Sequence, residues 1–196
     1  MATRQRTRDP ARREKILDAA AGLLATSGFH SVSMADIGEK AGITGSGIYR
    51  HFSSKSEILV VLFEQVIDDL LEDGRHVVEE TPDVREALSK LIDGQVAFVV
   101  DKRHLAQIYH NEIHNLPHDD QVRLRRKQRL YIEEWVHLLG EVTPEVDELD
   151  ARTLIHAAIG AIQSALFHQV VLPHERLREL LRQSAESVLH LSESLA

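Results

Sequence analysis

Apolar residues recur at intervals of three and four along almost the whole chain. The first such segment contains Ile16, Ala19, Ala20, Leu23 and Leu24, and it ends at a glycine. These intervals place the apolar side chains on one face of an α-helix. Prolines, which end helices, separate the later segments at Pro82, Pro117, Pro144 and Pro173. The pattern predicts an all-α fold of about nine helices.

The strongest local signals lie between residues 31 and 59. Ser33 precedes a short helical pattern and has Asp36 three residues later, as in a capping box. Gly42 is expected to end that helix, because glycine adopts a left-handed backbone at little cost. A second short helix is expected over Gly45 to His51. Two short helices joined by a tight turn predict a helix-turn-helix, whose second helix enters the major groove of DNA.

The later helices are predicted from caps and breaks. Ser54 and Glu57 are expected to begin a long helix that ends near Arg75. Thr81 is expected to cap the next helix, which is apolar on nearly all sides apart from Gln95 and therefore suits the middle of a bundle. Four further helices are expected. The first ends at Leu116, the next two cover residues 119–139 and 146–171, and the last begins after Pro173.

The net charge of −8 is unevenly distributed. Residues 1–60 hold nine Lys and Arg against six Asp and Glu, a net charge of +3, whereas the remainder holds 14 against 25, a net charge of −11. A basic N-terminal part on an acidic body is the asymmetry expected of a DNA-binding sensor. The chain has no cysteine and no apolar run of membrane-spanning length, which favours the cytoplasm and no membrane partner.

Three sequence blocks in the helix-turn-helix region carry a family resemblance. Residues 35–44 read ADIGEKAGIT, residues 47–52 read GIYRHF and residues 54–59 read SKSEIL. Together they resemble the TetR family of bacterial transcriptional regulators, over about residues 10–60. The resemblance implies a flexible basic arm (residues 1–9), a three-helix DNA-binding domain (10–54) and a helical effector-binding and dimerisation domain (55–196). It also implies that the protein is not an enzyme and has no cofactor.

The resemblance also implies that the partner is an operator of double-stranded DNA and indicates which residues contact it. Ser33, Thr44, Tyr49, His51 and Lys55 match positions that touch backbone phosphates. Many members carry Lys or Arg where this chain has a glycine at position 45, so base readout is expected to fall to neighbouring side chains or to DNA shape. The expected DNA-binding residues are Arg12, Ser33, Thr44, Gly45, Ser46, Tyr49, Arg50, His51 and Lys55.

A small hydrophobic effector is expected in the helical body. Its predicted binding residues are Phe98, Tyr109, His110, Ile113, Arg129, Trp135 and Leu138. One hypothesis is that the effector also carries an anionic group, which the basic residues between Arg123 and Arg129 would bind. A fatty acyl-CoA ester would combine an apolar chain with such a group. Effector binding is expected to release a repressor from DNA, and a ligand-dependent activator is the alternative.

A rival hypothesis uses the histidines. His104, His110 and His114 lie in one segment, and His110 and His114 are one helical turn apart, a spacing that allows a shared metal ion. The alternative is therefore a helical metal-binding protein or enzyme. The segment does not match the H-E-x-x-H zinc motif, because its glutamate is displaced by one position.

The last two helices are expected to form a homodimer. The resemblance implies a four-helix interface between two chains, which would place two recognition helices about one DNA turn apart on a palindromic operator. The predicted interface residues are Leu154, Ala158, Ile162, Ala165, Leu181, Ala185 and Val188.

Overall fold

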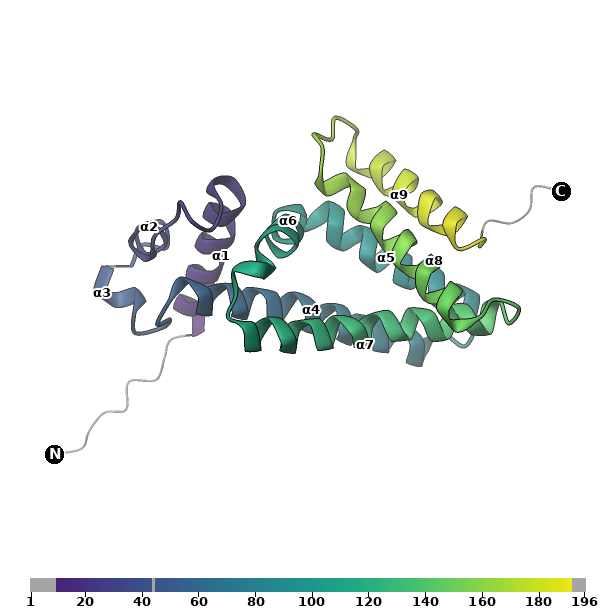
Figure 1. Cartoon of the computed structure of the whole chain (residues 1–196). Helices are drawn as coiled ribbons and strands as arrows, with labels where there is room; N and C mark the ends of the chain where they lie inside the picture. Colours follow the sequence, from purple (N-terminus) through teal and green to yellow (C-terminus); the bar gives the residue numbers. More distant parts are fainter. Residues whose placement is uncertain (1–9, 44, 192–196) are drawn as a thin grey trace. The chain divides into compact units, whose positions relative to one another are not determined.

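A computed structural model describes residues 10–43 and 45–191, and these residues are helical with short connections (Figure 1). The α-helices are α1 (Pro10–Ser27), α2 (Met34–Lys40), α3 (Gly45–Ile48), α4 (Lys55–Glu80), α5 (Val84–Asp101), α6 (Arg103–Glu112), α7 (His118–Val142), α8 (Glu148–Gln163) and α9 (His174–Val188). Two 3₁₀ turns follow α6 and α8, η1 (Ile113–Asn115) and η2 (Ser164–Leu166). The all-α prediction is confirmed. The predicted arm over residues 1–9 lies outside the described residues.

The chain divides into two compact units, which are described separately below. The first contains residues 1–64 and 107–121, and the second contains residues 65–106 and 122–196. The predicted boundary at residue 55 differs from this division, because the start of α4 and the segment 107–121 group with α1–α3.

In the first unit, α1, α2 and α3 enclose a small apolar core. Leu24, Ile37, Ile48 and Phe52 are buried there, as the helical pattern predicts. Gly42 has φ +68° at the turn between α2 and α3, a backbone conformation that favours glycine. A side chain at Gly38 would lie 3.2 Å from the Ile43 carbonyl oxygen, so this glycine allows the chain to return closely over α2.

Two predicted helix boundaries are wrong near residue 80. α4 extends to Glu80 rather than ending near Arg75. The N-cap of α5 is Asp83 rather than Thr81, since its carboxylate accepts the Glu86 N–H at 2.8 Å. Thr81 is buried, and its hydroxyl accepts a hydrogen bond from Lys90 at 3.1 Å.

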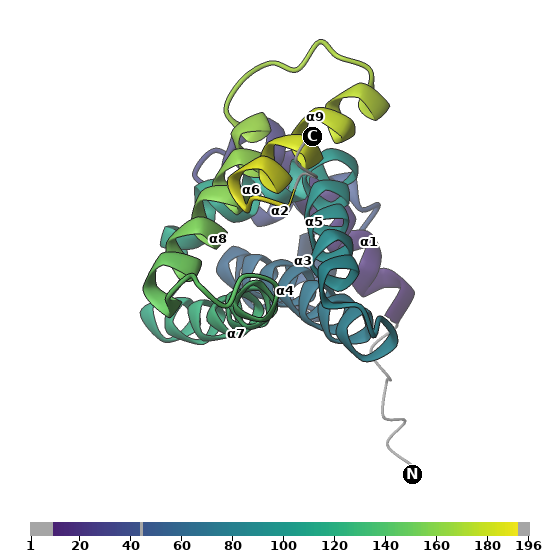
Figure 2. The ribbon, with the colours of Figure 1, turned by 90° about the vertical axis from the view of Figure 1, so that its right-hand side faces the viewer.

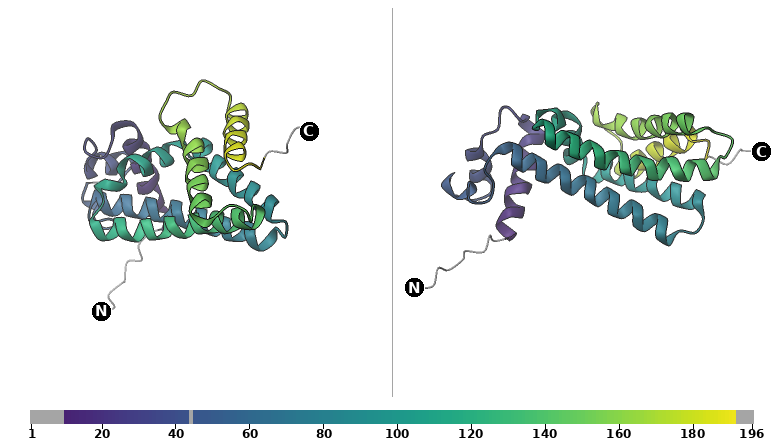
Figure 3. Two further views of the ribbon diagram at one scale, coloured as in Figure 1. Left: turned by 45° about the vertical axis from the view of Figure 1, so that its right-hand side comes forward. Right: turned by 60° about the horizontal axis from the view of Figure 1, so that its bottom comes forward.

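In the second unit, α8 and α9 lie side by side and both pack on α5 (Figures 2 and 3). α5 buries Leu88, Ile92, Val96 and Val99. Because it has apolar residues on most sides, it occupies the middle position that its sequence predicts.

The predicted end of α8 is wrong. The regular helix stops at Gln163 and the turn η2 stops at Leu166, whereas the prediction continued to Val171. Beyond η2 the chain is extended or bent as far as Pro173, and Val171 is 90% exposed. Among the described residues, no helix combines the length and apolar character needed to cross a membrane.

Candidate nucleic-acid interface and effector site

The N-terminus of α2 is held by a complete capping box. The Asp36 N–H donates to Ser33 Oγ at 3.2 Å, and the Ser33 N–H donates back to Asp36 Oδ2 at 2.8 Å. The Ser33 hydroxyl also donates to the same carboxylate oxygen at 2.7 Å. These bonds from Ser33, the backbone bond foremost, lower the pKa of Asp36 below its ordinary value of 3.8. Ser33 therefore fixes the start of α2, as predicted.

A Ser33→Ala change should lower the free energy of unfolding by about 1 kcal/mol at neutral pH, since it removes one half of the cap. The pKa of Asp36 is lower in the folded chain, so its contribution is complete above pH 3.8 and is lost as the pH falls through the folded pKa. Urea unfolding of wild type and variant at pH 7, 5 and 3.5 would measure how the difference in unfolding free energy depends on pH. A difference between wild type and variant that is equal at all three pH values would contradict the link between the cap and the carboxylate.

The one-turn helix α3 presents two exposed side chains just beyond its end. Ile48 and Phe52 are buried beneath it, and the Arg13 guanidinium lies 4.9 Å from the centre of the Phe52 ring. Tyr49 is 59% exposed and Arg50 is also exposed. The buried pair therefore anchors a turn from which Tyr49 and Arg50 point into solvent.

The other predicted DNA-binding residues differ in their surroundings. Arg12 is exposed on α1, whereas His51 is half-buried and its Nδ1 makes no hydrogen bond with the described residues. Gly45 and Ser46 form the start of α3, but their side chains are not described. Thr44 lies outside the described residues.

Lys55 is half-buried and binds backbone carbonyl groups of the first unit. Its ammonium donates to the carbonyl oxygen of Phe29 and, at 2.5 Å, to that of Val32. The same group lies 4.2 Å from the centre of the Phe29 ring. This geometry differs from the predicted phosphate contact, because it turns the ammonium toward the loop between α1 and α2.

Glu112, at the end of α6, holds the same loop from another side. Its Oε1 accepts the Phe29 N–H at 3.2 Å, and its Oε2 accepts the Asn115 side-chain amide at 2.5 Å. Glu112 is not among the site residues predicted from the sequence. No local signal marks it, since its partner is 83 positions away along the chain.

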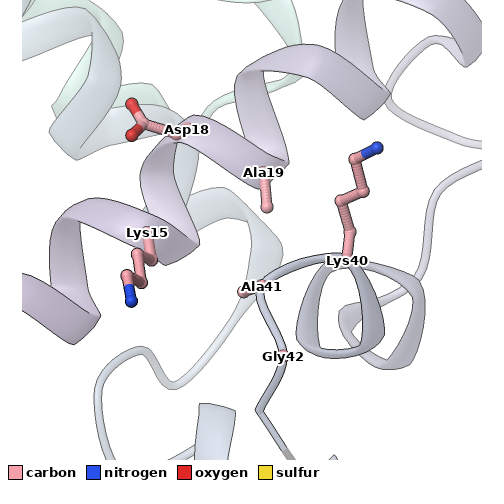
Figure 4. Close-up of a pocket in the computed structure, with 6 residues that line it drawn as sticks. All are labelled: Lys15, Asp18, Ala19, Lys40, Ala41 and Gly42. Carbon is pink, nitrogen blue, oxygen red and sulfur yellow. The ribbon is translucent and has the colours of Figure 1, made fainter.

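A hollow of about 520 Å³ lies between α1 and the end of α2 (Figure 4). Lys15, Asp18 and Ala19 line it from α1, and Lys40, Ala41 and Gly42 line it from the end of α2 and the following turn. The two lysines add positive charge to this part of the first unit.

The structure does not bring the seven predicted effector residues into one unit. Tyr109, His110 and Ile113 belong to the first unit, where Tyr109 packs edge-on against Phe63 with ring centres 4.8 Å apart. The other four belong to the second unit: Trp135 and Leu138 are buried, Phe98 is half-buried and Arg129 is exposed. The predicted single cluster is therefore not present within either unit.

Phe98 lines an acidic hollow on the second unit. The hollow measures about 160 Å³ and lies between α4 and α5, where Asp69, Asp73, Asp101 and Lys102 also line it. Lys102 lies 3.4 Å from Asp69. Three carboxylates repel an anion, so this hollow does not suit the anionic group proposed from the sequence.

The core of the second unit contains polar side chains. Gln95 and Tyr131 are buried, and the Tyr131 hydroxyl donates to Gln95 Oε1 at 3.2 Å. Trp135 lies next to Tyr131 with ring centres 5.9 Å apart. The otherwise apolar core of the second unit therefore contains a buried hydrogen bond between side chains of α5 and α7.

The histidine hypothesis gains no support from the geometry. In the part of the chain that the structure describes, no three His, Asp or Glu residues are arranged to hold a metal ion. His104 lies in the second unit, whereas His110 and His114 lie in the first.

Most of the predicted dimer residues are buried within a single chain. Ala158, Ile162, Ala165, Leu181 and Ala185 are at most 7% exposed, and only Leu154 and Val188 are partly accessible. A residue covered by its own chain cannot be covered again by a partner. The apolar spacing of α8 and α9 therefore marks the faces that pack within the chain.

The structure is thus a helical protein in which a capped helix-turn-helix belongs to one compact unit and a helical core to another. Residues 16–62 match the family described as bacterial regulatory proteins, tetR family. The chain belongs to the TetR family of bacterial transcriptional regulators.

Comparison with a curated relative supports this assignment. The transcriptional repressor KstR2 of Mycobacterium tuberculosis is 31% identical over 135 residues, which are 66% of each chain. A KstR2 repressor from Rhodococcus jostii is 30% identical over 105 residues, 54% of this chain and 52% of that protein. The matches thus span between about half and two thirds of these relatives.

Solved structures share the fold over nearly the whole chain. A TetR-family regulator from Bordetella parapertussis gives a TM-score of 0.84 at 20% identity, covering 94% of this chain and 97% of that one. AibR, solved in complex with isovaleryl coenzyme A and operator DNA, gives a TM-score of 0.76 at 17% identity, covering 87% and 96%.

Proposed function

We propose that this protein is a homodimeric transcriptional repressor that binds a palindromic operator and is released from it by a small, largely apolar effector. The exposed Tyr49 and Arg50 beyond the anchored helix α3 carry this proposal. A capped α2 and a buried Phe52 hold these side chains in place for contact with DNA. The net charge of +3 over residues 1–60 favours a polyanionic partner.

The proposed dimer uses the exposed side of α8. Thr153, Ala157 and Gly160 on α8, and Ser164 directly after it, are exposed and recur at intervals of three and four residues. Small residues on one helical face allow a second helix to approach closely. This stripe replaces the buried residues predicted from apolar spacing.

The proposed effector is an acyl-CoA-like molecule with an apolar body. AibR was solved with isovaleryl coenzyme A, which supports this ligand class for a protein of the same fold. Within this chain, the buried Trp135 and Leu138 provide the apolar surroundings that such an acyl group requires.

Selection of bound DNA from a genomic library, followed by a salt titration on the selected site, tests the proposal. We expect a palindrome whose association constant falls steeply with salt, because phosphate contacts release counterions. A promoter–reporter assay would then separate a repressor from an activator. Failure to enrich any sequence over non-specific binding would refute sequence-specific regulation.

A Tyr49→Ala change should weaken operator binding about tenfold, equally for all sequences, and should flatten the salt dependence. The melting temperature should stay within about 1 °C, since this side chain is exposed and anchors no core. Fluorescence anisotropy with labelled operator would measure the affinity. Leu130→Ala is the matched control, because Leu130 is similarly exposed on α7. Equal losses in both variants would contradict a DNA contact by Tyr49.

A further inference from the structure

The first half of α7 carries a run of basic residues in an otherwise acidic unit. The second unit holds 14 Lys and Arg against 21 Asp and Glu, yet residues 122–130 contain five basic residues and no acidic one. Within this run, Arg125 and Arg129 are four residues apart, a spacing at which like charges destabilise a helix. An anionic partner would relieve this repulsion.

The structure places four of these basic residues in solvent. Between residues 122 and 130, every exposed residue is an arginine or is apolar: Val122, Arg123, Arg125, Arg126, Arg129 and Leu130. We call these six residues the α7 ridge. Lys127 is half-buried and pairs with Asp68 at 2.7 Å, so it is not part of the ridge. Arg126 and Arg129 form no ion pair with the residues that the structure describes.

The α7 ridge also exposes apolar surface. Val122 is 50% exposed and Leu130 is 53% exposed. Arg126 lies between them at intervals of four residues, so the three side chains are neighbours on one face of the helix. Arginine is enriched in protein–protein interfaces. The ridge therefore offers a partner both apolar contact and charged hydrogen-bond donors.

An exposed helix face suits a macromolecule better than a small molecule. Small-molecule sites are concave and enclose most of their ligand. None of the four arginines of the ridge lines the hollow between α4 and α5. The ridge is therefore a surface for docking rather than the wall of a pocket.

The extent of the ridge favours a short acidic segment over DNA or a membrane. Its nine helical positions extend about 12 Å along α7. Acidic residues border it, because Asp68 contacts Lys127 from α4 and the exposed Glu133 follows on α7. A DNA duplex or an anionic bilayer would extend beyond the ridge and meet these carboxylates, since repulsion is screened only beyond about 8 Å at physiological salt. A short segment would meet the arginines alone.

We propose that the α7 ridge binds an acidic, amphipathic helix of a partner protein. Its carboxylates would pair with Arg126 and Arg129, and its apolar side chains would cover Val122 and Leu130. A guanidinium group binds a carboxylate through two parallel hydrogen bonds, which gives such a pair a defined geometry. An interface this small is of the transient kind. The inference does not depend on the operator or the effector proposed above.

A synthetic acidic helix tests the proposal on the full-length protein. The probe is a fluorescent peptide of about fourteen residues, with leucine at intervals of three and four and glutamate elsewhere. One control peptide has glutamine in place of glutamate, and a second has the composition of the probe in an order without an apolar face. In fluorescence anisotropy, the probe should bind about tenfold more tightly than either control. Its affinity should fall severalfold between about 50 and 200 mM salt.

Variants of the ridge locate the binding. Arg126→Glu reverses one charge and should weaken probe binding about tenfold, and Leu130→Ala should weaken it about threefold through lost apolar contact. Arg75→Glu is the matched control, because Arg75 is an exposed arginine on α4 in the same unit and its replacement changes the net charge equally. It should leave probe binding within about twofold. Circular dichroism checks that each variant keeps its helical fold.

Three results would overturn the inference. They are a probe that binds no better than the control peptides, an Arg126→Glu protein with wild-type affinity, and equal losses in Arg126→Glu and Arg75→Glu. The wild-type comparison of peptides decides the matter even if a variant fails to fold.

Two further titrations test the other polyanions. They use vesicles of phosphatidylcholine mixed with phosphatidylglycerol, and a duplex without the operator sequence. If the protein shows no preference for the probe and binds either polyanion in a way that Arg126→Glu abolishes, the ridge belongs to lipid or to nucleic acid, and the inference fails.

Discussion

A Lys55→Ala variant is expected to lose operator binding at every salt concentration and to lower the free energy of unfolding by about 2 kcal/mol. The ammonium binds the carbonyl oxygens of Phe29 and Val32, so its removal leaves two partly buried acceptors without their charged donor. The cation–π contact with Phe29 is lost as well. The loop between α1 and α2 then no longer holds the start of α2.

Urea unfolding and operator anisotropy distinguish this role from the phosphate contact predicted by resemblance. Loss of a phosphate contact lowers operator affinity and leaves the free energy of unfolding unchanged, whereas loss of the loop contacts changes both. Lys127→Ala is the matched control: its ammonium pairs with Asp68 at 2.7 Å near the surface, where an ion pair contributes less than about 1 kcal/mol. A Lys55→Ala protein of wild-type stability would contradict the structural role.

A Gly160→Leu variant is expected to be monomeric and to retain its fold. Gly160 is exposed in the exposed stripe of α8, and a Cβ atom there would have no neighbour within 4 Å in the same chain. Leucine also has a higher helix propensity by about 1 kcal/mol, so a single chain should become no less stable. In a dimer packed on this stripe, the larger side chain would prevent close approach of the second helix. Operator affinity should then fall at least a hundredfold, because one half-site contact is lost.

Analytical ultracentrifugation and circular dichroism together test this prediction. Gly94→Leu is the control, since Gly94 is an exposed helical glycine on α5 that also has no neighbour within 4 Å of its Cβ position. A dimeric Gly160→Leu protein would exclude this stripe from the interface. A variant that is monomeric and unfolded would instead place the residue in the core.

Local signals in the sequence predicted the helix-turn-helix well. The Ser33–Asp36 box, the Gly42 turn and the burial of Ile48 and Phe52 depend on residues within a few positions of one another. The errors arose where local signals compete. Near residue 80, three adjacent residues can cap or begin a helix, and Asp83 provides the cap because its carboxylate reaches the Glu86 N–H. Beyond Leu166, apolar residues continue although the helix does not.

The candidate sites were less predictable, because they depend on contacts between distant segments. α8 carries apolar or small residues on two sides, and the sequence alone does not indicate which side faces α5. The larger residues face inward, so Ile162 is buried and Gly160 is exposed. Lys55 was assigned to DNA by position, whereas its actual partners lie 26 and 23 residues away.

The contacts around Phe29 also bear on how the chain is synthesised. Lys55 and Glu112 hold the same short loop, and the segment 107–121 belongs to the same compact unit as α1–α3. A nascent chain that has emerged only as far as Glu64 therefore has the helix-turn-helix residues without one of its two supports. The first unit is complete only after residues 107–121 have also left the ribosome. A DNA-binding domain transferred to another protein should accordingly include the segment 107–121, since a cut after the first helices would divide a compact unit.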